Sequence, residues 1–208
     1  MQARYDAPRG ARLDDDEDGE ERAPQTPGAL VKHLLESRTV LLTGPVTDEL
    51  SQRIMAQLLV LDAQDTTKPI RIYINSPGGS VDAGFAIYDC MRFVRSPVYA
   101  ICAGLAASAA TLILLGAAKG RRISMPNTRF LLHQPSTGMQ GQASDVAIGA
   151  REILKLRQRL NELMAQETGQ PLERIATDTH RDYWMSAEEA LEYGLIDSVV
   201  ASAADLPA

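Results

Sequence analysis

The stretch SPVYAICAGLAASAATLILLGAA, residues 96–118, decides between two kinds of protein. It holds no charged residue over 23 positions, which is long enough to cross a lipid bilayer. However, its first half is rich in strand-forming residues, its second half has the composition of a helix, and Gly104 separates the two. Both flanks are basic. We therefore interpret the stretch as a buried strand, a turn at residues 104–108 and a buried helix, and we predict no membrane span.

Ser108 stands among alanines at the front of this predicted helix. Three explanations are open for a hydroxyl at this place. It is an N-cap for the helix, a small residue in a membrane span, or a nucleophile on a strand-to-helix turn. The rest of the sequence has to decide among them.

The order of strand, turn and helix recurs from residue 29 onward. We predict longer helices over residues 29–38, 47–63, 81–94, 109–117 and 144–167, and shorter ones within 172–180 and 186–194. Predicted strands cover residues 39–44, 70–75, 97–104, a short segment before Pro126, a segment ending at His133, and 195–200. Such units of about 30 residues predict an α/β fold, in which helical crossovers connect parallel strands.

Charge is concentrated at the start of the chain. The whole chain of 208 residues has a net charge of −6, and residues 1–28 contribute eight acidic residues against four arginines. This segment is rich in Pro and Gly and has no periodicity, so we predict a disordered acidic tail followed by one domain over residues 29–208. No basic face is evident in the domain, so nucleic acid is not an expected partner.

The cysteine pattern and the N-terminus indicate a cytoplasmic protein. Cys90 and Cys102 lie in apolar segments without a CxxC spacing, which predicts buried, reduced thiols. The N-terminus lacks the apolar core of a signal peptide.

A serine nucleophile needs a base, and the chain has three histidines. His33 has helical spacing and is expected to be half-buried in its helix. His180 lies in a charged stretch that we predict to be surface. His133 ends a buried strand, which is where parallel α/β proteins place functional side chains. The pattern favours His133 as the base and leaves His180 as the alternative.

The segment NSPGGS, residues 75–80, could stabilise an oxyanion. Pro77 fixes one turn dihedral, and the two glycines allow backbone N–H groups to face a ligand. The alternative is a plain turn in which Ser80 caps the next helix. The sequence has no P-loop lysine, no complete G-x-G-x-x-G and no G-x-S-x-G motif.

Several segments together resemble the ClpP family, the proteolytic subunits of Clp proteases. They are YINSPGGSVDAGFAIYDCM (73–91), GLAASAATLILLGAAKGRR (104–122), PNTRFLLHQPSTGMQGQASDVAIGAREILK (126–155), NELMAQETGQ (161–170) and DTHRDYWMSAEEALEYGLIDS (178–198). The resemblance implies the ClpP/crotonase fold, a spiral of ββα units with a protruding handle helix. It also implies a cytosolic serine endopeptidase that hydrolyses unfolded proteins inside an oligomeric chamber.

The resemblance also implies roles for single residues. Ser108 corresponds to the nucleophile, His133 to the base, and Asp182 to the aspartate that orients this base. The oxyanion donors would be the backbone N–H groups of Gly79 and Ala109. No metal or organic cofactor is implied.

The family resemblance extends to assembly and partners. The segment 144–167 corresponds to the handle through which two seven-membered rings stack, and Arg181 corresponds to an arginine in contacts between rings. The apolar residues of this segment form more than one narrow stripe: Val146, Ile153, Leu156, Leu160, Leu163 and Met164. The expected partners are a AAA+ unfoldase of the Clp family, which would use the ATP, and unfolded polypeptide.

The chain departs from the family at several positions. Ala109 replaces a usual methionine, Leu105 a glutamine and Ala110 a glycine; Arg71 replaces a tyrosine that often helps form the unfoldase-docking pocket, although Tyr73 is retained. Residues 1–38 match neither the family's axial-loop sequence nor the Asp-Ile-Tyr-Ser stretch that follows it. Two alternatives remain: a structural subunit with little activity in mixed rings with a second ClpP paralogue, and a crotonase-like acyl-CoA enzyme on the same fold.

Overall fold

The computed structural model describes residues 28–136, 138 and 140–206. Its helices are α1 Gly28–Glu36, α2 Asp48–Gln64, α3 Val81–Phe93, α4 Ala109–Leu114, α5 Ala143–Thr168, α6 Leu172–Asp178, α7 Ala187–Tyr193 and the 3-10 helix Ala203–Asp205. Its strands are β1 Thr39–Thr43, β2 Ile70–Ser76, β3 Val98–Ala107, β4 Arg122–Ser124, β5 Arg129–Leu132, β6 Tyr183–Met185 and β7 Ser198–Val199. The tail predicted for residues 1–28 lies, except for Gly28, outside the described residues.

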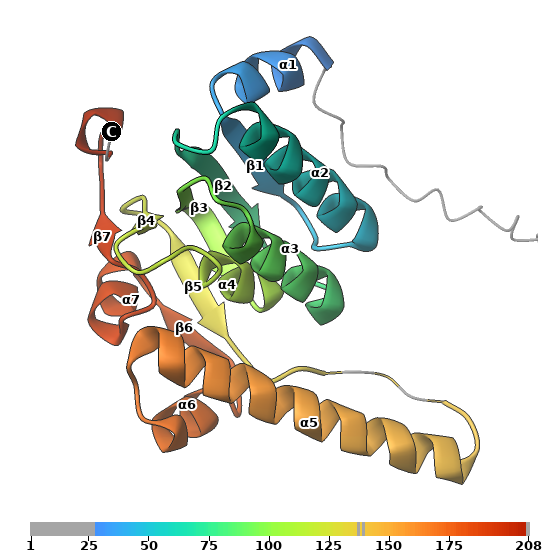
Figure 1. The fold of residues 1–208 in the computed structure, drawn as a ribbon. Helices are drawn as coiled ribbons and strands as arrows, with labels where there is room; N and C mark the ends of the chain where they lie inside the picture. Colours follow the sequence, from blue (N-terminus) through green and yellow to red (C-terminus); the bar gives the residue numbers. More distant parts are fainter. Residues whose placement is uncertain (1–27, 137, 139, 207–208) are drawn as a thin grey trace, which may run out of the picture.

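The described strands form one sheet (Figure 1). β1, β2, β3, β4 and β7 follow one another across it, and each neighbouring pair is parallel. β5 runs parallel to β3, whereas β6 runs antiparallel to β5. The predicted α/β architecture is confirmed. The sequence prediction missed β6 because three residues are too few to show an alternating pattern.

β3 changes its neighbour half-way along its length. Up to Cys102 it pairs with β4, and from Leu105 it pairs with β5. Gly104, with φ 76°, lies at this change, where the register against β2 also shifts. The predicted turn at residues 104–108 therefore starts too early: Gly104 marks a bulge, the strand continues to Ala107, and the turn to α4 comes at Ser108. The bulge brings the end of β3 beside β5.

α2 is amphipathic, as its sequence predicts. The hydroxyl of Thr47 caps this helix by accepting a hydrogen bond from the Leu50 N–H at 3.2 Å. Its predicted apolar face is buried against the sheet: Leu50, Ile54, Leu58 and Leu61. Figure 1 shows α2, α3 and α4 side by side across the same sheet. None of the helices in the described part of the chain is both long and apolar enough to cross a membrane.

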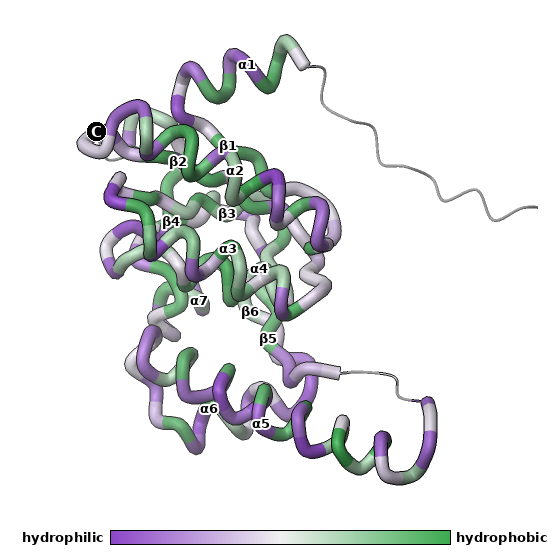
Figure 2. The backbone as a smooth tube through the Cα atoms, turned by 45° about the vertical axis from the view of Figure 1, so that its right-hand side comes forward, coloured by the Kyte–Doolittle hydropathy of each residue, from purple (hydrophilic) through white to green (hydrophobic). Residues whose placement is uncertain are grey.

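α5 extends well beyond the sheet, and α6 packs beside the C-terminal end of α5 (Figures 1 and 2). The buried residues of α5 all lie in its C-terminal third: Leu160, Asn161, Met164 and Glu167. Farther toward its N-terminus Val146, Ile148 and Leu154 are exposed. At the C-terminal end of α5, the buried side chains of Arg122 and Glu167 form an ion pair. The single chain therefore covers only one end of α5, as the apolar pattern predicts.

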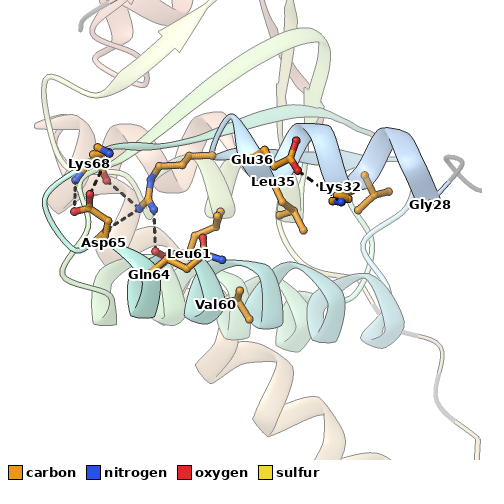
Figure 3. Close-up of a pocket in the computed structure, with 11 residues that line it drawn as sticks. Gly28, Lys32, Leu35, Glu36, Val60, Leu61, Gln64, Asp65 and Lys68 are labelled. Carbon is orange, nitrogen blue, oxygen red and sulfur yellow. Dashed lines mark hydrogen bonds and ion pairs between the residues drawn. The ribbon is translucent and has the colours of Figure 1, made fainter.

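α1 packs loosely on the rest of the domain. It has no buried residue, and its His33 is 74% exposed and pairs with Glu36 at 3.0 Å. The prediction of a half-buried His33 is wrong, because helical spacing alone does not show how closely a helix is covered. A cavity of about 730 Å³ separates α1 from α2 (Figure 3).

Arg38, between α1 and β1, ties several segments together. Its guanidinium donates hydrogen bonds to four carbonyl oxygens and one hydroxyl: Leu61 O, Asp65 O, Lys68 O, Pro69 O and Ser96 Oγ. We expect Arg38→Met to lower the free energy of unfolding by about 2–3 kcal/mol, because it leaves several of these acceptors without a donor. Urea unfolding at equal protein concentrations measures the loss.

The control for this prediction is Arg53→Met. Arg53 lies exposed on α2 and has no hydrogen bond or ion pair with another residue of the described ranges. Equal stabilities for the two variants would contradict the role given to Arg38.

Candidate active site

Ser108 occupies a strained turn between β3 and α4. Its backbone has φ 55° and ψ −121°, a conformation that non-glycine residues rarely adopt. Such strain costs about 1–3 kcal/mol and is concentrated at functional sites. The hydroxyl makes no capping hydrogen bond to α4, although Ser80 and Ser186 do cap their helices. The N-cap explanation for Ser108 is therefore wrong, whereas the one for Ser80 is confirmed.

β5 brings His133 to the same edge of the sheet. The parallel register pairs Ala107 with Leu131, and the N–H of Ser108 donates to the Leu131 carbonyl at 2.9 Å. His133 follows two residues after Leu131, at the end of β5. Because both strands end at this edge, the backbones that carry Ser108 and His133 are neighbours. Within the described residues, no hydrogen bond joins the two side chains.

Asp182 faces His133 from the adjacent strand. β6 starts one residue later, and its Tyr183 is paired with Leu132 of β5. His133 Nδ1 lies 3.2 Å from Asp182 Oδ1, and the two side chains are 32% and 63% exposed. The structure thus brings these two predicted residues together through the antiparallel pair that the sequence did not reveal.

The two other histidines, and the first aspartate of the DTHRD segment, have different neighbours. His33 pairs with Glu36 on α1, and His180 is exposed, with its backbone carbonyl bound by Gln134. Asp178 accepts a hydrogen bond from the Tyr193 hydroxyl at 2.9 Å. Burial and this hydrogen bond raise the pKa of Tyr193. Of the three histidines, His133 is the one beside a carboxylate at the strand edge that carries Ser108.

The glycine turn after β2 packs directly on Ser108. Gly78 has φ 88°, and a Cβ there would lie 2.5 Å from the Ala107 carbonyl oxygen and 2.7 Å from Ser108 Cβ. Gly79, the predicted oxyanion donor, instead lies against Val46. The family resemblance gave a role to Gly79 and none to Gly78. Both glycines belong to the NSPGGS segment, but Gly78 is the one that no larger residue can replace beside Ser108.

Two backbone N–H groups of this region, those of Gly79 and Ala109, have no acceptor within the described part of the chain. The Val46 N–H donates to the Gly78 carbonyl at 2.9 Å, and the Val46 carbonyl accepts from the Ser80 N–H at 2.8 Å. Since backbone groups of successive residues in an extended segment point to opposite sides, the N–H of the intervening Gly79 points away from Val46. Ala109 is the first residue of α4, so its N–H has no intrahelical acceptor. Neither N–H donates to another residue in the described part of the chain.

Metal ligands and cysteines were the other candidates for chemistry in this chain. Within the described ranges, no cluster of three or more His, Cys, Asp or Glu side chains could hold a metal ion. Cys90 and Cys102 are free and buried, and burial raises the pKa of both thiols, which disfavours the reactive thiolate form.

Comparison with known proteins identifies the family. The family model described as Clp protease matches residues 24–203. This chain belongs to the Clp protease family. One relative in it is the ATP-dependent Clp protease proteolytic subunit 2 of Treponema pallidum, 50% identical over 190 residues that cover 90% of this chain and 96% of the relative. The protein of the same name from Treponema denticola is 48% identical over 179 residues, covering 86% and 90%.

Membership in the Clp protease family agrees with the fold described above. The sheet of parallel strands, the crossover helices and the long protruding α5 are those expected from the sequence resemblance. The family match also favours a peptidase over the acyl-CoA enzyme considered as an alternative.

Proposed function

We propose that this chain is a serine endopeptidase in which Ser108, His133 and Asp182 form the catalytic triad. The observation that carries the proposal is the strained backbone of Ser108 at φ 55°, on the strand edge where His133 and Asp182 lie 3.2 Å apart. A comparable strained strand-to-helix turn presents the nucleophile in α/β-hydrolases, although the G-x-S-x-G motif is missing here.

The acylation step follows from this arrangement. His133 directs Nδ1 toward Asp182, so its Nε2 is the nitrogen that accepts the Ser108 proton as Oγ attacks the peptide carbonyl carbon. The N–H groups of Gly79 and Ala109 stabilise the resulting oxyanion. When the C–N bond breaks, His133 returns the proton to the leaving amine, and an acyl ester remains on Ser108.

Deacylation uses the same groups in reverse roles. His133 takes a proton from water, the hydroxide attacks the acyl carbon, and the Ser108 oxygen leaves with a proton from His133. Asp182 remains ionised and stabilises the imidazolium in both steps. In this mechanism no metal or organic cofactor takes part.

Assembly completes the proposal. The exposed apolar residues at the N-terminal end of α5 require a cover, and a second ring would provide it in two stacked seven-membered rings. Enclosed sites would limit the substrates to unfolded polypeptide. The free thiols fit the reducing cytoplasm.

A cavity offers a place for the proposed AAA+ unfoldase of the Clp family. It measures about 240 Å³ and is lined mainly by apolar side chains: Tyr73, Ile101, Met125, Pro126, Asn127, Val200, Ala201, Ser202, Ala203 and Leu206. Arg71 is not among these lining residues. We therefore place unfoldase docking at Tyr73, and the change at Arg71 does not remove the cavity.

Hydrolysis of a short fluorogenic peptide by the purified full-length chain tests the proposed function. We expect ATP-independent turnover that survives EDTA. Absence of turnover in every assembled form of this chain would contradict it. Turnover that appears only after adding a second ClpP paralogue would support the alternative, a subunit of mixed rings with little activity of its own.

Arg181 should connect assembly to activity. It is exposed, precedes Asp182 directly, and has no hydrogen bond or ion pair with another residue of the described segments. We expect Arg181→Ala to shift the protein toward single rings and to lower peptidase activity together, because a contact between rings would hold the Asp182 segment in place. Sedimentation and peptidase assays on the same samples measure both effects, with Arg53→Ala as the control. Fully active single rings would refute the coupling.

A further inference from the structure

Gln134, the residue after His133, holds the chain segment that leads to Asp182. Its backbone N–H donates to the Thr179 carbonyl at 2.7 Å, and its side-chain Nε2 donates to the His180 carbonyl at 2.8 Å. Gln134 therefore makes two hydrogen bonds across to a segment more than forty residues away, at consecutive carbonyls.

These bonds lie on one side of the His133–Asp182 pair. On the other side, Leu132 pairs with Tyr183 in the β5–β6 ladder. Asp182 is thus held beside His133 from two sides. The β5–β6 ladder fixes the residue after Asp182, and the hydrogen bonds from Gln134 fix the residues before it. The ladder alone would leave the segment before Asp182 without a connection to β5.

The partner of Gln134 is itself well anchored. Thr179 is 1% exposed, and its hydroxyl lies 3.1 Å from Asn161 Oδ1 and 2.7 Å from the Ile175 carbonyl oxygen. Asn161 is buried at the base of α5. The backbone N–H of Gln134 therefore joins the end of β5 to a fixed point between α5 and α6, and the side-chain bond to the His180 carbonyl extends this connection toward Asp182.

The carboxylate of Asp182 depends on this backbone placement. It is 63% exposed, and within the described residues the hydrogen bond to His133 is its single hydrogen bond. In the part of the chain that the structure describes, no donor besides His133 bonds this carboxylate and could correct its position when the segment shifts. The placement of its backbone thus controls the alignment of the imidazole.

We propose that Gln134 is a positioning residue, which acts on catalysis by holding Asp182 beside His133. This inference rests on the proposed function. The sequence gives no sign of it beyond the polar residue after His133, because both acceptors are backbone carbonyls on a distant segment.

The test replaces the side-chain donor by an apolar group of similar length. We expect Gln134→Met to lower kcat about tenfold to hundredfold, because a shift of about 1 Å in a catalytic group has effects of this size. KM should stay within about twofold, because Gln134 would not bind the substrate. The matched control is Gln170→Met, which removes two side-chain hydrogen bonds away from the triad, one to the Tyr193 carbonyl at 3.0 Å and one from Arg174 at 2.9 Å.

A double-mutant cycle separates positioning from stability. If Gln134 acts through Asp182, then Gln134→Met should change kcat less than about twofold in an Asp182→Asn background, where the carboxylate is already lost. Gln170→Met should leave kcat unchanged in both backgrounds. Equal factors for Gln134→Met in the two backgrounds would overturn the inference, as would an unchanged kcat in the single variant.

A second variant and the dependence of turnover on Ser108 separate a folding defect, a failed proposed function and a failed positioning role. If Gln134→Met does not assemble, Gln134→Glu serves instead, because its carboxylate keeps the size but cannot donate to the His180 carbonyl. If wild-type turnover does not depend on Ser108, the proposed function fails. If wild-type turnover depends on Ser108 and Gln134→Met is fully active, the positioning role alone fails.

Discussion

Ser108→Ala should lower the hydrolysis of a short fluorogenic peptide by about four to six orders of magnitude, in line with the loss of a triad serine elsewhere. The reason is chemical: alanine has no oxygen to form the acyl ester. Assembly should be intact, because the Ser108 hydroxyl caps no helix. Steady-state kinetics and sedimentation on the same preparation measure both quantities.

Ser186→Ala is the matched control. Ser186 also precedes a helix, but its hydroxyl accepts a hydrogen bond from the Glu189 N–H at 3.2 Å in a capping box. Its loss should reduce the free energy of unfolding by about 1 kcal/mol and leave peptide hydrolysis nearly unchanged. Retained hydrolysis in pure Ser108→Ala protein would refute the assignment of the nucleophile.

Gly78→Ala should have the second largest effect, a loss of at least about a hundredfold in kcat/KM. The new Cβ would lie 2.7 Å from Ser108 Cβ, too close for van der Waals contact, so either the glycine turn or the nucleophile must shift. A shifted turn misaims the Gly79 N–H, and losing one oxyanion donor costs about 10²–10³-fold. Peptide kinetics together with melting temperature measure the effect.

Gly120→Ala separates this contact from backbone strain. Gly120 has φ 86°, close to the 88° of Gly78, but a Cβ there meets no atom within 4 Å. Both variants carry the strain of a left-handed residue, roughly 1–2 kcal/mol. Only Gly78→Ala should lose activity. Equal activities for the two variants would show that the turn does not support Ser108.

The alternation of strands and helices could be predicted from local pattern. Strand and helix periods, the Thr47 cap and the buried face of α2 are properties of neighbouring residues. The path of β3 could not be predicted in this way, since Gly104 is equally suited to a turn or a bulge. Its pairing with β5 decides between them, and that pairing depends on residues more than twenty positions away.

The candidate site was predicted in part. The strand end favoured His133 over His180 without excluding the latter, and Asp182 came from family resemblance alone. Its place beside His133 depends on β6, a strand too short to have a pattern. Gly78 and Gln134 were not singled out, because their contacts are with backbone atoms of distant segments and leave no trace in side-chain chemistry.

The central claim is that His133 and Asp182 activate Ser108 as the nucleophile. Reaction of the full-length assembly with a fluorophosphonate, followed by peptide mapping with mass spectrometry, tests it most directly. We predict one adduct, on Ser108, which forms far more slowly in His133→Ala. An adduct on another residue, or an active peptidase whose Ser108 stays unmodified, would contradict the account.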